Sequence, residues 1–75
     1  MISENELKMK VGKNVRKYRK LDGRYTQKEL ASLIGVTTAL LGALESPNIC
    51  QGISIYTLYK ISKVLDVSIE KFFEN

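Results

Sequence analysis

The sequence predicts an all-α protein, a compact domain of five helices. Apolar residues recur at spacings of three and four, as on one face of an α-helix, in most of the segments that we expect to be helical. No stretch alternates between apolar and polar residues over the length of a strand. Hydroxyl residues stand where several of these helices would begin, as N-caps do. We therefore expect one folded domain over residues 9–75, preceded by a short frayed segment over residues 1–8.

The first helix is predicted from a single apolar stripe. Its members share one face, because they are separated by four, three and three positions: Val11, Val15, Tyr18 and Leu21. Asp22-Gly23 follows the stripe, and glycine commonly ends a helix because it adopts a positive φ without strain. We expect this helix to end at Asp22 and to bury the stripe.

Two short helices joined by a tight turn are predicted at about 27–34 and 37–45. Thr26 and Glu29 have the spacing of a capping box, in which each side chain bonds the backbone N–H of the other residue. Gly35 suits the positive φ that ends the first of these helices, and Thr37 or Thr38 is the expected N-cap of the second. Such a helix pair is a common device for entering the DNA major groove.

Small and large apolar residues in this pair stand where its packing requires them. Ala31 permits the second helix to cross closely over the first, because a larger side chain would separate their axes. Leu41 and Leu44 are three residues apart, so they share a face and are expected to close the core.

A fourth and a fifth helix complete the predicted domain. Ser46-Pro47-Asn48 ends the third helix, and Ser54 is the expected cap of the fourth. The stripe of the fourth helix is predicted to be buried, with Tyr59 and Val64 alongside: Ile55, Leu58, Ile61 and Leu65. Asp66-Val67-Ser68 is expected to cap a short fifth helix at 69–73 that closes the bottom of the core.

Composition excludes several classes of site. The chain of 75 residues contains no His and one Cys, which excludes a His-based catalytic triad, a His/Cys zinc site and an internal disulfide. No nucleophile and base stand at a spacing typical of catalysis, so we expect neither an enzyme nor a cofactor. The lone thiol, with no signal peptide and no apolar run of about 20 residues, favours a cytoplasmic location.

Positive charge is concentrated in the first part of the chain. The net charge is +4, but residues 1–28 hold nine Lys or Arg against three acidic residues, a balance of +6, and the remainder carries −2. A polyanion would therefore be attracted to the amino-terminal half. A solvated helix face that is charged for solubility is the alternative interpretation.

The chain resembles the phage repressor and Cro type of helix-turn-helix domain, often called the xenobiotic-response-element family. The resemblance extends from Val11 to Phe73. Its segments are residues 26–31, 35–37, Glu45, 54–58, 65–69 and 72–73. It implies a five-helix lambda-repressor-like domain with its helix-turn-helix at helices two and three. It further implies a transcriptional regulator, expected to be a repressor, that binds double-stranded DNA by sequence as a homodimer.

The resemblance also implies a set of site residues. The second helix of the motif lies in the major groove in this family, which assigns five residues to the bases: Thr37, Thr38, Ala39, Gly42 and Ala43. The start of the preceding helix and of the fourth helix lie on the backbone, which assigns phosphate contacts to Thr26, Gln27 and Ser54. Arg16 and Lys20 are expected to bind phosphates of any sequence. Arg19 matches an arginine that pairs with the residue here numbered Glu45, a structural pair.

The chain departs from the family at the helix that would read the bases. Family members commonly carry polar side chains at the positions of Ala39, Leu40, Gly42 and Ala43. Without them, base discrimination rests on two threonines and on methyl contacts, or on DNA shape, and each missing bidentate pair forgoes about 1–3 kcal/mol. The alternative function is a protein-interaction adaptor or antirepressor that presents Leu40 to a protein partner.

Overall fold

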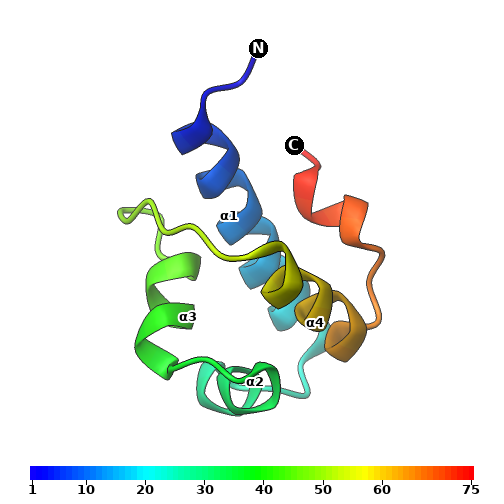
Figure 1. Cartoon of the computed structure of the whole chain (residues 1–75). Coiled ribbons are helices and arrows are strands. Elements are labelled where there is room, and N and C mark those ends of the chain that lie inside the picture. The colour runs from blue at the N-terminus through cyan, green and yellow to red at the C-terminus, as the bar shows by residue number, and fades with distance from the viewer.

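A computed structural model describes residues 1–75 and shows four α-helices and no strand. The α-helices are α1 (Glu4–Asp22), α2 (Gln27–Ile34), α3 (Thr38–Glu45) and α4 (Ile55–Leu65), and a 3₁₀ segment, η1 (Ile69–Phe73), follows. α2 closes one end of the molecule, and both chain termini lie toward the other end (Figure 1). None of the helices is long and apolar enough to cross a bilayer.

The predicted fifth helix is wrong as an α-helix. Residues 69–73 form a 3₁₀ segment, and Ser68 makes no side-chain capping bond to it. Five residues make little more than one turn of α-helix, and 3₁₀ geometry is confined mostly to short pieces of helix. The segment still closes the core, because Phe72 is fully buried.

Both ends of α2 and the starts of α3 and α4 follow the predicted caps. Thr26 and Glu29 form the complete capping box, and Gly35 ends α2 with φ of 74°. Thr37 and not Thr38 is the N-cap of α3, with its hydroxyl accepting from the Leu40 N–H at 3.0 Å. Ser54 caps α4 in the same way through the N–H of Thr57.

α1 begins earlier than its apolar stripe predicts. Ser3 is its N-cap and accepts from the Glu6 N–H at 3.1 Å, so residues 4–8 belong to the helix. The pattern of Ser followed by Glu three residues later was the available signal. Fraying of residues 1–8 in solution stays a prediction.

The core gathers one face of every helix. It consists of eleven buried apolar residues: Val11, Val15, Leu30, Ala31, Ile34, Leu41, Leu44, Leu58, Ile61, Leu65 and Phe72. Two residues of the predicted buried stripes are exposed, namely Leu21 at 70% and Ile55 at 81%, and Tyr59, expected beside the α4 stripe, is 49% exposed. Leu21 and Ile55 lie in the terminal turns of their helices, and Tyr59 lies on the outer edge of the α4 stripe.

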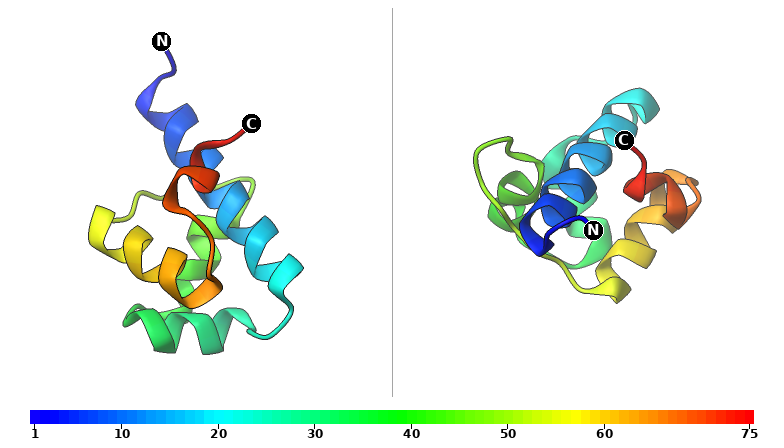
Figure 2. Two further views of the ribbon diagram at one scale, coloured as in Figure 1. Left: turned by 90° about the vertical axis from the view of Figure 1, so that its right-hand side faces the viewer. Right: turned by 90° about the horizontal axis from the view of Figure 1, so that it is seen from above.

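α1 lies between α3 on one side and η1 on the other (Figure 2, right). On the η1 side, the buried Asn14 amide donates to the carbonyls of Phe72 at 2.8 Å and Glu74 at 2.7 Å. The rings of Tyr18 and Phe72 meet edge to face with centroids 5.8 Å apart. These contacts hold the end of the chain against one side of α1, and α3 packs against the other side.

Candidate nucleic-acid interface

The outer face of α3 carries the residues predicted to face bases. Thr37, Thr38 and Ala39, at the start of the helix, are exposed, whereas Gly42 and Ala43, one turn later, are half-buried. Leu41 and Leu44 occupy the opposite face and are buried in the core. The start of α3 therefore projects into solvent on a helix whose other side is anchored.

The amino termini of α2, α3 and α4 each carry a hydroxyl that already serves as the cap of its helix. Thr26 accepts from the Glu29 N–H at 3.1 Å and Thr37 from the Leu40 N–H, so each hydroxyl proton is still available to a phosphate or a base acceptor. Ser54 differs, because its hydroxyl also donates to the Thr57 oxygen at 2.9 Å. A phosphate contact by Ser54 requires that bond to be exchanged.

Three side chains from three helices form a bonded network behind this face. Glu45, at the end of α3, accepts two bonds of 2.8 Å from Arg19 of α1 and one of 3.0 Å from the Gln27 amide of α2. Arg19 also donates to the carbonyl of Tyr25 at 3.2 Å. The hydrogen bonds to Glu45 raise the pKa of the Arg19 guanidinium above its usual value, so Arg19 stays protonated. The network fixes α3 relative to α1 and α2.

Gln27 belongs to this network as well as to the predicted phosphate contacts. Its amide nitrogen has two donors, one of which is used by Glu45, so the other is available to a ligand. No local sequence pattern predicts the bond from Gln27 to Glu45, because the two residues lie 18 positions apart.

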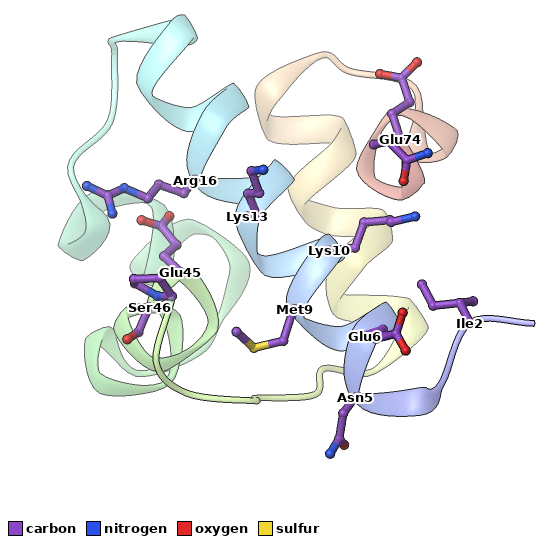
Figure 3. A pocket seen from close by; sticks show the side chains of 12 residues that line it. Ile2, Asn5, Glu6, Met9, Lys10, Lys13, Arg16, Glu45, Ser46 and Glu74 are labelled. Carbon is purple, nitrogen blue, oxygen red and sulfur yellow. The ribbon is translucent and has the colours of Figure 1, made fainter.

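Arg16 and Lys20 lie on the exposed side of α1. Figure 3 shows Arg16 extending from α1 toward the side on which Glu45 and Ser46 lie, at the end of α3. The structure thus brings Arg16 close to the helix that would enter DNA, at its carboxyl end.

Gly42 has space for a side chain. A Cβ at this position would lie 3.5 Å from the Gln27 Oε1 atom, an ordinary van der Waals contact, and would meet nothing closer. The fold itself therefore does not require glycine here. Glycine in a helix is less favourable than alanine, and its presence here is compatible either with close approach of a partner or with simple tolerance.

Comparison with known proteins identifies the family. The family model described as Helix-turn-helix matches residues 15–72, most of the chain. The chain belongs to the helix-turn-helix family. No curated protein matches the sequence of this helix-turn-helix chain.

A solved structure of similar fold is the crystal structure of SinR, described as the master regulator for biofilm formation, in complex with DNA. The two chains are 38% identical in sequence. The match covers 85% of this helix-turn-helix chain and 98% of the SinR chain, and the two structures superimpose with a TM-score of 0.74. The matched region of the family model contains every residue predicted for the interface. Their individual roles stay predictions.

Proposed function

We propose that this helix-turn-helix protein is a transcriptional regulator, specifically a repressor, that binds double-stranded DNA by inserting α3 into the major groove. The observation that carries the proposal is the exposed start of α3, held by the network of Arg19, Glu45 and Gln27. A preorganised helix binds at lower entropic cost than one that must be ordered on contact. The similarity to SinR, whose crystal structure contains DNA, adds support.

The proposed contacts divide by what they recognise. Thr37, Thr38, Ala39, Gly42 and Ala43 would face base edges, where the threonine hydroxyls bond acceptors and the small side chains meet thymine methyl groups. Thr26, Gln27, Ser54, Arg16 and Lys20 would contact phosphates, which sets affinity and position rather than sequence preference. Because the base-facing set is poor in polar groups, DNA shape would supply a large share of the specificity.

We further propose that the protein acts in the cytoplasm as a homodimer on DNA, with two copies of α3 placed one helical turn of the duplex apart. Sedimentation velocity should show weak self-association that strengthens when an operator duplex is present. A complex that contains one protein copy per operator at saturating protein would exclude this arrangement.

The decisive experiment compares two kinds of substitution on two kinds of duplex. A preferred site is first selected from random duplexes, and binding to it and to a random duplex is measured at two salt concentrations. Thr38→Ala should weaken the selected complex by up to about tenfold and leave the random one nearly unchanged. Arg16→Ala and Lys20→Ala should weaken both complexes alike and should reduce the salt dependence.

The alternative function, an adaptor or antirepressor that binds a protein partner through α3, predicts no duplex binding even at low salt. Leu40, the apolar residue on which that hypothesis depends, is half-buried, so α3 presents a small apolar area. In the duplex experiment, equal losses of affinity for the selected and the random duplex in Thr38→Ala would exclude a role for Thr38 in base recognition.

A further inference from the structure

A groove lies over the outward face of α1, away from the start of α3. It has a volume of about 880 Å³ and runs between the segment that ends α3 and the carboxyl-terminal residues Glu74 and Asn75. Figure 3 shows Lys10, Lys13 and Arg16 projecting from α1 around this groove, with Met9 between α1 and Ser46. The proposed DNA contacts make use of Arg16 alone among these side chains.

The cations of the groove have few acidic partners within the molecule. None of the four ion pairs includes Lys10, Lys13 or Arg16. Of the acidic residues in the groove, Glu45 is bound by Arg19, and Glu74 is bound by Tyr18 and Lys71. Among the side chains of the groove, Glu6 carries the one carboxylate outside these bonds, so three cationic side chains without an ion pair face one such carboxylate.

The basic character of this face continues along α1. Its lysines recur at spacings of three, four and three: Lys10, Lys13, Lys17 and Lys20. At a rise of 1.5 Å per residue, this stripe is about 15 Å long. It therefore matches the length of a partner helix of roughly ten residues. The stripe lies on the side of α1 that does not contact the core.

Apolar side chains accompany these cations. Met9 is half-buried in the groove, Ile2 is 39% exposed, and Pro47 contributes from the segment after α3. A phosphate backbone offers no apolar partner to such residues, whereas a polypeptide can supply carboxylates and apolar side chains together. The combination favours an acidic polypeptide that also carries apolar side chains.

We propose that the groove over α1 binds an acidic, amphipathic segment of a partner protein. Its carboxylates pair with Lys10, Lys13 and Arg16, and one or two of its apolar side chains contact Met9 and Pro47. Because Arg16 is also a proposed phosphate ligand, occupation of the groove lowers duplex affinity. The docking itself does not depend on the proposed DNA binding.

The test uses the full chain and a fluorescein-labelled probe peptide of about 14 residues. The probe consists of glutamate with leucine at every third or fourth position, and a matched peptide has serine in place of leucine. Fluorescence anisotropy should show saturable binding of the leucine peptide and at least fivefold weaker binding of the serine peptide. Amide chemical shifts should change at Met9, Lys13 and Ser46.

Variants separate this site from general attraction by charge. The double variant Lys10→Gln/Lys13→Gln should weaken the leucine peptide up to about tenfold, as loss of two exposed ion pairs implies. The matched control, Lys60→Gln/Lys63→Gln in α4, removes the same charge and should change affinity less than twofold. Met9→Gln should weaken the peptide several-fold and leave duplex DNA binding unchanged.

Several outcomes would overturn the proposal. These are the absence of saturable peptide binding at millimolar concentration, equal binding of the two peptides, equal losses from both double variants, or shift changes confined to residues 37–43. Peptide binding without any duplex binding would overturn the proposed function and leave this inference standing.

Discussion

Gly12 of α1 faces the backbone carbonyl of Leu44 in α3 with no room between them for a side chain. A Cβ on Gly12 would overlap the carbonyl oxygen and would lie 3.1 Å from the carbonyl carbon. The obstacle is backbone, so it cannot move aside as the end of a flexible side chain could. This contact sets the distance between α1 and α3, and hence the position of the proposed DNA-binding face.

Gly12→Ala should therefore destabilise the protein. Overpacking of a methyl group against fixed backbone typically costs about 1–3 kcal/mol, in spite of the higher helix propensity of alanine. Urea unfolding followed by circular dichroism measures the change. Stability equal to that of the wild type would contradict the contact between Gly12 and Leu44.

Gly42→Ala is the matched substitution, and its expected effect has the opposite sign. Because the added Cβ would make only an ordinary contact with Gln27, the gain in helix propensity should appear nearly in full, about 0.8–1 kcal/mol. The same unfolding experiment measures it. If Gly42 closely approaches the DNA major groove, the duplex affinity of this variant should fall. Unchanged affinity would favour simple tolerance of glycine at this position.

Local signals in the sequence were sufficient to predict both ends of α2 and the start of α4, although the start of α1 was missed. Thr26 with Glu29, Ser54, and the glycine at position 35 act through atoms within a few residues, so their patterns carry the geometry directly. The choice between Thr37 and Thr38 was open because both can accept the same kind of bond. The structure assigns the cap to Thr37.

Contacts between distant segments could not be predicted in the same way. Gly12 is constrained by a residue in another helix, and Asn14 bonds a carbonyl 58 positions away. Helical spacing assigned Leu21 and Ile55 to the apolar stripes of their helices. It does not indicate how far along each helix the rest of the protein covers the stripe, and both residues are exposed. Family resemblance supplied the pair of Arg19 and Glu45, which the structure contains. The bond from Gln27 to Glu45 is visible only in the structure.

The pair of Arg19 and Glu45 predicts strong coupling in a double-mutant cycle. The side chains are 11% and 1% exposed, so removing either partner leaves a nearly buried charge behind. Glu45→Ala should destabilise the protein by about 3 kcal/mol, within the usual range for breaking a buried pair. Arg19→Ala should also destabilise it, because Glu45 loses two hydrogen bonds and the Tyr25 carbonyl one.

Arg19→Ala/Glu45→Ala should cost less than the sum of the single changes, because the double variant leaves no unpaired charge. Chemical denaturation of the four proteins at one pH gives the coupling free energy. Additive effects would contradict a direct interaction. Gln27→Ala serves as a milder control, since it removes one neutral donor to Glu45 and leaves the ion pair intact.

Stability should decrease in acid, and the capping box contributes to this decrease. The hydrogen bond that the Thr26 backbone N–H donates to the Glu29 carboxylate lowers the pKa of Glu29 below its ordinary value of 4.5. A bond from Arg24 lowers the pKa of Asp22, and a bond from Tyr18 lowers that of Glu74. Each carboxylate binds a proton less readily in the folded than in the unfolded chain. Its contribution is complete above the unfolded pKa and is lost as pH falls through the folded pKa.

Glu29→Gln isolates one of these contributions. Glutamine also completes a capping box, so the variant should keep α2 but lose the titration. Its free energy of unfolding, measured by urea denaturation from pH 6 down to pH 2.5, should fall less steeply below about pH 4.5 than that of the wild type. Glu6→Gln is the control, because the Glu6 carboxylate takes part in none of the ion pairs. An acid limb that is equally steep in Glu29→Gln and in the wild type would mean that the charge of Glu29 contributes nothing to the folded state.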